Sequence, residues 1–168
     1  MSIRNLLLPF TLPLGLLILG SWRLAANPAP ARPDYARPPL GGATCSTNPS
    51  LADDLLREGH RLGIAVVRGE PELQGRDASY RAEPGRLGTI TLKPRPMAAK
   101  VRCMLISHEF IHVLQHLYGN LKGVPPLGWG AREDLLVRTG SAQEAEAYTH
   151  QNHAGYVLQL LKATKRPR

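Results

Sequence analysis

The chain has 168 residues and a formal net charge of +8, and 5% of its residues are aromatic. This length allows one domain of modest size. Aromatic side chains this sparse exclude a platform on which nucleic-acid bases stack, so no nucleic-acid partner is expected.

Residues 1–26 have the pattern of an export signal. Arg4 supplies a positive charge, residues 6–20 are apolar, and Leu24-Ala25-Ala26 is an acceptable cleavage site. No charge occurs between Arg4 and Arg23, so an uncleaved membrane anchor is the alternative. Both interpretations predict an exported protein whose remaining residues lie in the periplasm or outside the cell.

Residues 27–47 are predicted to form a linker. The segment is rich in proline and contains Gly41-Gly42, a composition typical of an extended, mobile spacer. Cys45 ends it, and the second cysteine of the chain is Cys103. In an oxidising compartment the two could form a disulfide, and two unlinked thiols are the alternative.

Residues 48–168 are predicted to form an α+β domain. The first helix should span residues 51–62, with Ser50 and Asp53 as a capping pair and Gly63 as its end. A short buried strand (64–67), a polar loop (68–77) and a hairpin (78–82 and 87–93) around Glu83-Pro84-Gly85-Arg86 should follow.

The next helix, from about residue 97 to 118, carries the motif His108-Glu109-Phe110-Ile111-His112. Residues i and i+4 share one helix face, so both histidines can reach one metal ion. Gln115 falls on the same side, and the opposite side is apolar, with Cys103, Ile106, Phe110, Val113, Leu114 and Leu117. Polar groups among apolar residues need partners, and a metal ion is one.

His116 is a poor third ligand, because the helix rises about 12 Å between positions 108 and 116. A zinc–nitrogen bond is about 2 Å long. The third ligand should therefore come from elsewhere in the chain, and a catalytic zinc needs only three protein ligands.

The third ligand is expected on a second helix, which Ser141 should cap and which should run to about residue 162. Glu144 shares its face with small and apolar residues that suit close packing. Glu146 shares its face with His150 and His153, which predicts a wetter environment. This comparison favours Glu144 over Glu146 without excluding the latter, and a capping role alone is the other interpretation of Glu144.

Residues 119–140 connect the two helices. Leu135 and Leu136 indicate a helical turn there, and Trp129 could line a cleft or anchor a surface loop.

The motif at 108–112, followed some thirty residues later by Glu144-x-x-Ala147, resembles the gluzincins, the zincin metallopeptidases whose third ligand is glutamate. The resemblance implies that zinc is held by His108, His112 and Glu144, with Glu109 as the general base. It also implies a small zincin-like domain with a short sheet, a central HExxH helix and a second ligand-bearing helix. Tyr148 replaces an aspartate that in the family orients a histidine ligand.

The resemblance further implies a strand whose exposed edge pairs with extended substrate, and Gly88-Thr89-Ile90-Thr91 is the candidate. The alternative is that this strand only completes a small sheet.

The expected function is that of an exported zinc-dependent metallopeptidase acting on peptides or proteins. Tyr148 is the first candidate for the donor that stabilises the oxyanion, ahead of His150 and His153. A non-catalytic secreted module with the same metal-binding or interaction residues is the rival. The basic C-terminus, with Lys162, Lys165, Arg166 and Arg168, could contact an anionic surface such as a membrane or could be a solvated tail. The sequence does not indicate an oligomeric state.

Overall fold

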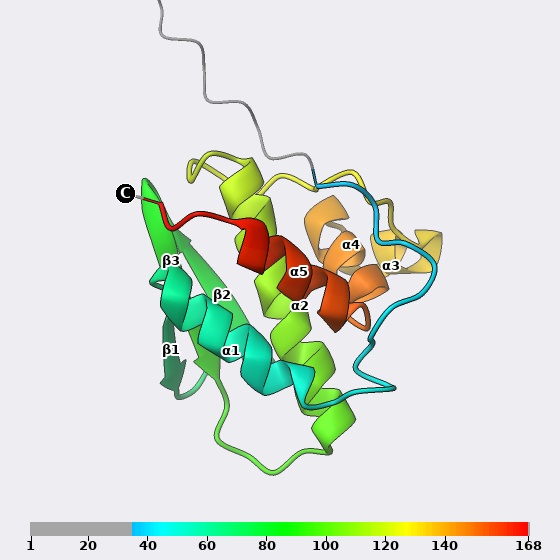
Figure 1. Cartoon of the computed structure of the whole chain (residues 1–168), viewed down its shortest axis with the longest axis horizontal. Coiled ribbons are helices and arrows are strands. Elements are labelled where there is room, and N and C mark those ends of the chain that lie inside the picture. The colour runs from blue at the N-terminus through cyan, green and yellow to red at the C-terminus, as the bar shows by residue number, and fades with distance from the viewer. Residues whose placement is uncertain (1–34, 168) are drawn as a thin grey trace, which may run out of the picture. The chain divides into compact units, whose positions relative to one another are not determined.

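The computed structural model describes residues 35–167, and the expected signal or anchor at 1–26 lies outside them. The described elements are α1 (Leu51–Leu62), β1 (Ala65–Arg68), β2 (Ala78–Glu83), β3 (Arg86–Leu92), α2 (Ala99–Tyr118), α3 (Glu133–Thr139), α4 (Ala142–His150) and α5 (Ala154–Ala163). Figure 1 shows this arrangement of helices and strands, which confirms the predicted α+β class.

The three strands form one mixed sheet in the order β1-β3-β2. β1 runs parallel to β3, and β2 pairs antiparallel with β3 through the predicted hairpin. Gly85 makes the turn with φ of 79°, a conformation that favours glycine. A Cβ on Gly88 would lie 1.7 Å from the carbonyl oxygen of Arg81, so only glycine fits at this point of the hairpin.

Two strand predictions were wrong. The run 64–67 was expected to be a buried strand, but β1 is an edge strand and Val67 is 45% exposed. The resemblance implied an exposed edge at Gly88–Thr91, but these residues belong to β3, whose two edges are both paired, which confirms the alternative that this strand only completes a small sheet. The edge strand that packs against α2 is β2. Apolar content alone does not reveal the position of a strand in a sheet.

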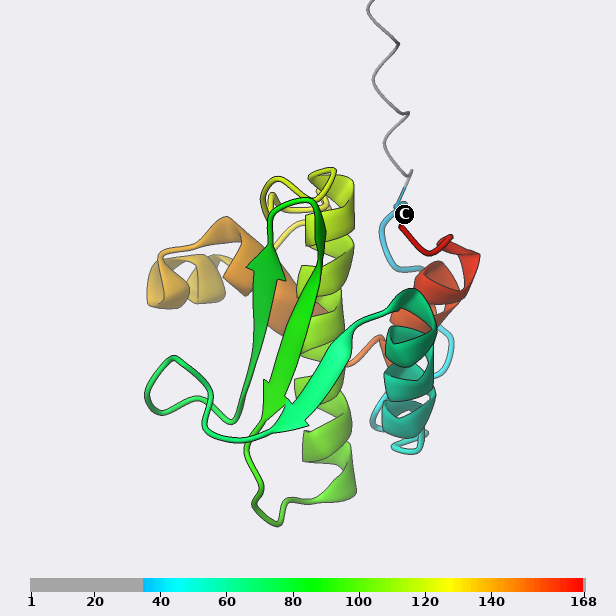
Figure 2. The same cartoon turned by 90° about the vertical axis from the view of Figure 1, so that its left-hand side faces the viewer.

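Helix α2 is central to the domain and contacts the sheet, α1, α4 and α5. Figure 2 shows it running along one face of the sheet, whose other face is open toward the viewer. The predicted apolar side is buried: Ile106, Phe110, Val113 and Leu114 are fully inaccessible. The Phe110 ring lies so close to Gly59 of α1 that a Cβ there would come within 2.6 Å of it.

The first helix has the predicted bounds and ends at Gly63, whose φ is 94°. The predicted capping pair is wrong, because the Ser50 side chain makes no cap hydrogen bond. Ser50 itself has helical torsion angles, and its hydroxyl donates to Oδ1 of Asn48 at 2.6 Å.

The single long helix expected from 141 to about 162 is also wrong, because the chain turns between α4 and α5. The break is stabilised by residues far away in the sequence. The carbonyl of Asn152 accepts from the N–H of Cys45 at 3.0 Å, and its side-chain oxygen accepts from the N–H of Ser46 at 3.1 Å.

The described part of the expected spacer, residues 35–47, is packed on the domain. Tyr35 is buried, and its carbonyl accepts from the indole N–H of Trp129 at 3.0 Å. Cys45 forms a disulfide with Cys103 on α2. Tyr35, Pro38 and Cys45 are therefore the points at which the segment is buried in the domain, whereas most of its other residues are exposed. Among residues 35–167, no helix is both long and apolar enough to cross a membrane.

Candidate metal centre

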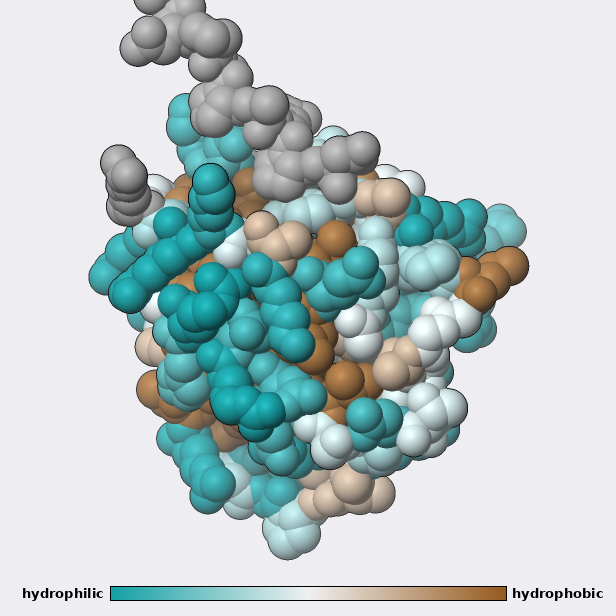
Figure 3. Space-filling view, viewed as in Figure 1, coloured by the Kyte–Doolittle hydropathy of each residue, from teal (hydrophilic) through white to brown (hydrophobic). Residues whose placement is uncertain are grey.

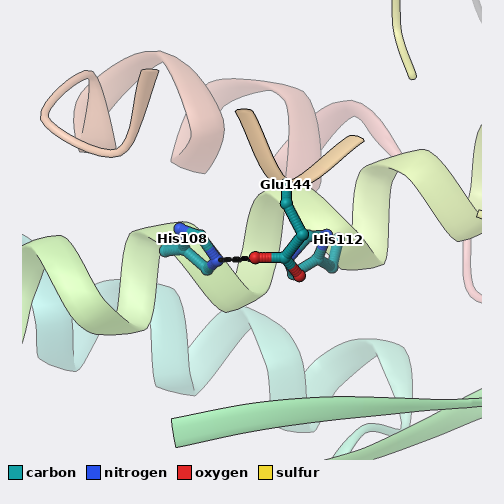
Figure 4. A group of neighbouring side chains, drawn as sticks. All are labelled: His108, His112 and Glu144. Atoms are coloured by element: carbon teal, nitrogen blue, oxygen red, sulfur yellow. Dashed lines mark hydrogen bonds and ion pairs between the residues drawn. The ribbon is translucent and has the colours of Figure 1, made fainter. Parts of the chain in front are cut away.

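Three potential metal ligands converge between α2 and α4, as Figure 4 shows. Nε2 of His112 lies 3.1 Å from Nε2 of His108 and 3.1 Å from Oε1 of Glu144. Nε2 of His108 lies 3.6 Å from Oε2 of Glu144. Ligand atoms around a tetrahedral zinc ion are separated by about 3.3 Å. These residues could therefore hold a metal ion.

Local structure places each of the three side chains. The two histidines are one turn apart on α2 and are 5% and 7% exposed, respectively. Glu144 lies in the first turn of α4, where its N–H donates to the Ser141 hydroxyl at 3.3 Å, as the predicted cap requires. Its carboxylate points to the histidines instead of back to the cap, and it is the more accessible member of the cluster.

Glu146, the alternative third ligand, has a different role. It is 2% exposed, so the expectation of a wetter environment was wrong, although the preference for Glu144 agrees with the cluster. Its carboxylate accepts the backbone N–H groups of Leu127, Gly128 and Trp129 at 2.7–2.9 Å. Glu146 thus holds the 119–140 connection against α4.

Gln115 links this structural carboxylate to the metal centre. Its side-chain oxygen lies 2.8 Å from Nδ1 of His112, and its amide nitrogen donates to Glu146 at 2.9 Å. An amide oxygen can only accept, so Nδ1 of His112 carries a proton, and the neutral imidazole would present the lone pair of Nε2 to a metal ion. The sequence placed Gln115 on the polar side of α2 but did not reveal this function.

His108 has a different environment. Its Nδ1 is buried and has no hydrogen-bond partner within the described residues. The ring of Tyr148 packs on the His108 ring with the centroids 4.4 Å apart. The hydroxyl of Tyr148 accepts a hydrogen bond from Arg76. Arg76 comes from the polar loop before β2, and no signal in the sequence pointed to it.

Glu109 lies beside the three ligands and is 4% exposed. Burial raises the pKa of its carboxyl to about 7, while nearby His112 and the backbone N–H of Tyr80 favour the ionised form. The imidazoles of His108 and His112, which face the Glu144 carboxylate, hold the pKa of that group far below its usual range. The centre thus contains one carboxylate that stays ionised and one that can exchange a proton near neutral pH.

The other histidines belong elsewhere. Nδ1 of His116 lies 2.8 Å from the Tyr80 hydroxyl, in agreement with its exclusion as a ligand. His150 donates through Nε2 to the carbonyl of Gly130 at 2.9 Å and packs against Trp129. Trp129 is 1% exposed and therefore anchors its loop instead of lining an open cleft. Neither His150 nor His153 lines the cavities beside the metal centre.

Comparison of the chain with protein-family models, with curated proteins and with solved structures found no match. The interpretation of the cluster therefore depends on the geometry and chemistry of its own residues.

Proposed function

We propose that this protein is an exported zinc-dependent metallopeptidase. The observation that carries the proposal is the convergence of His108, His112 and Glu144, with the buried carboxyl of Glu109 beside them. A groove of about 450 Å³ reaches His108 and Glu109, so a substrate has access to the centre.

The donor set fits zinc. Two imidazoles and one carboxylate are a common set for a catalytic zinc with three protein ligands. Oε2 of Glu144 is buried and has no hydrogen-bond partner within residues 35–167, which leaves a lone pair for a cation. When bound here, zinc would polarise a carbonyl group and lower the pKa of a water molecule.

Glu109 is the proposed general base. It lies next to His108 on α2 and lines the same groove. Its carboxylate would accept a proton from the attacking water and then donate that proton to the leaving amine. Its low exposure limits solvation of the carboxylate and keeps the proton near the reacting atoms.

Tyr148 is the proposed donor to the oxyanion. Because the Arg76 guanidinium donates to the phenol oxygen, the hydrogen of the phenol is free to be donated onward. A positioned O–H group at the carbonyl oxygen stabilises the charge that develops during attack. This role requires Tyr148 to face the groove, and it is one of the lining residues.

The edge of β2 is the proposed support for an extended peptide, in place of β3. Ala78, Ser79 and Tyr80 line a small cavity together with the metal cluster. A peptide beside this strand could add to the sheet through main-chain hydrogen bonds.

Export remains part of the proposal. The disulfide between Cys45 and Cys103 supports it, because such bonds persist in oxidising compartments.

The substitution Glu109→Gln tests the function. The variant should keep stoichiometric zinc and lose at least about a hundredfold in peptide hydrolysis, because only the proton acceptor is removed. Zinc content and cleavage of a mixed peptide pool are measured side by side, with Glu72→Gln in the exposed loop as the matched control. A Glu109→Gln variant that cleaves at the wild-type rate would contradict the assignment. Wild-type protein that holds zinc but neither cleaves nor binds a hydroxamate would favour the non-catalytic module.

A further inference from the structure

The groove beside the metal centre is lined by segments from different parts of the chain. One wall is the loop before β2, which contributes Arg76 and Asp77. The other is formed by α3 and α4, which contribute Arg138 and Tyr148, and the floor is the α2 segment that carries His108. A substrate that enters this groove therefore meets two arginines beside His108.

The ionisable side chains that line the groove, besides His108 and Tyr148, are Arg76, Arg138, Asp77 and the buried carboxyl of Glu109. Asp77 is held by Arg95, with Nε to Oδ1 at 2.7 Å, so its charge is already neutralised. Arg76 donates to the phenol oxygen of Tyr148 and forms a long ion pair with Glu144, the proposed zinc ligand, at 3.9 Å. Arg138 forms no ion pair or hydrogen bond with any residue between 35 and 167. Arg138 is thus available to an anion, and Arg76, whose ion pair with Glu144 is long, adds positive charge beside it.

The lining does not suit an apolar side chain. Leu105 and Ala78 are its apolar members, whereas most of the other side chains are polar or charged. Burial of a substrate leucine or phenylalanine against such walls would gain little from the hydrophobic effect and would desolvate the arginines. A carboxylate would bind more favourably, because a guanidinium group can donate two parallel hydrogen bonds to it.

We propose that this groove is a carboxylate-binding subsite and that the enzyme prefers peptides with a carboxylate next to the bond that is cleaved. The inference rests on the proposed peptidase function and adds its substrate class. The carboxylate can belong to an aspartate or glutamate side chain or to the C-terminus of the peptide. Arg138 carries recognition alone, whereas Arg76 also contacts Tyr148 at the metal centre.

The test measures binding apart from turnover. The full chain with Glu109→Gln is loaded with zinc and titrated into labelled pentapeptides that differ at one position: Glu, Gln or Lys. Each peptide is made with a free and with an amidated C-terminus, and binding is followed by fluorescence anisotropy. We expect at least about fivefold tighter binding of the Glu peptide than of the Gln peptide, and still weaker binding of the Lys peptide. A gain that depends on the free C-terminus alone would identify the C-terminal carboxylate as the group bound.

Arg138→Ala in the same background should reduce the preference to less than about twofold. Arg132→Ala is the matched control, since it removes the same charge at the start of α3 outside the groove and should leave the preference unchanged. Equal affinity for all peptides, or no binding of any, would overturn the subsite. Wild-type protein that fails to cleave the Glu peptide bound by the variant would refute the peptidase function and leave the subsite standing. Cleavage of all peptides without a preference for carboxylates would refute the subsite and leave the peptidase function standing.

Discussion

Glu144 and Glu146 lie two residues apart on α4 and have different environments. Glu144 is the more accessible and faces two imidazoles, whereas Glu146 is enclosed by backbone N–H groups. A helical wheel separates the two faces but does not say which face meets α2 and which meets a loop. The choice of Glu144 could be made from the sequence, but the reason for it came from the structure.

Gln115 is predicted to strengthen metal binding. Gln115→Leu removes the acceptor for Nδ1 of His112, so the imidazole loses its fixed tautomer and orientation. Loss of such a partner typically weakens metal binding about 10- to 100-fold. Competition with a chromophoric zinc chelator measures the change. Gln159→Leu, at an exposed position on α5, is the control, and equal zinc affinity of all three proteins would show that Gln115 does not orient His112.

Among the elements, α2 and the hairpin follow from local pattern. The apolar side of α2 and the Pro84-Gly85 turn are properties of short stretches of sequence, and both predictions were confirmed. The break between α4 and α5 depends on Cys45 and Ser46, more than a hundred residues earlier. Contacts of that separation leave no periodic signal in one sequence. The contact between Arg76 and Tyr148 could not be predicted for the same reason, because nothing near Arg76 in the chain indicates it.

The disulfide is predicted to stabilise the arrangement of these elements. It joins the segment before α1 to α2 across 58 residues of sequence. Removing a bridge of this kind typically costs about 2–4 kcal/mol, so Cys45→Ser with Cys103→Ser should lower the thermal midpoint clearly. Calorimetry of the oxidised protein and the double variant measures the difference. Thiol titration gives an independent check: equal free thiol before and after reduction would mean that no bridge forms.

At the scale of the domain, the face drawn in Figure 3 does not present one large apolar surface. Figure 3 shows mostly hydrophilic side chains over α1 and α5, with hydrophobic ones scattered between them. The large exposed apolar side chains come from separate parts of the chain: Leu40, Val67, Leu73, Val101, Leu136 and Val137. Contact of the basic C-terminal residues with an anionic surface stays a prediction.

Global stability is predicted to depend on pH through His116. Burial lowers the pKa of this imidazole, and its Nδ1 accepts from the Tyr80 hydroxyl, which itself accepts from the N–H of Gly88. The unfolded value is about 6.5, so the stability from neutral His116 is complete above that pH and is lost as the pH falls below it.

The measurement is the free energy of unfolding of metal-free protein between about pH 7.5 and 5.5. This range brackets the pKa of histidine in the unfolded chain. The difference between wild type and His116→Gln should shrink as the pH falls, because only the wild type carries this histidine. Using the difference cancels the opposing effect of Glu109, whose raised pKa favours the folded state at lower pH. A difference that is constant across the range would contradict the prediction.

The most direct test of the central claim is the zinc content of the purified full chain, determined by elemental analysis beside Glu144→Ala and Glu146→Gln. We predict about one zinc ion per wild-type chain. Glu144→Ala should fold normally and lose most of the zinc, because it removes one of three ligands. Glu146→Gln should be less stable but keep the metal while folded. Well-folded wild-type protein that takes up no zinc even after remetallation, or zinc that depends on Glu146 and not on Glu144, would contradict the account.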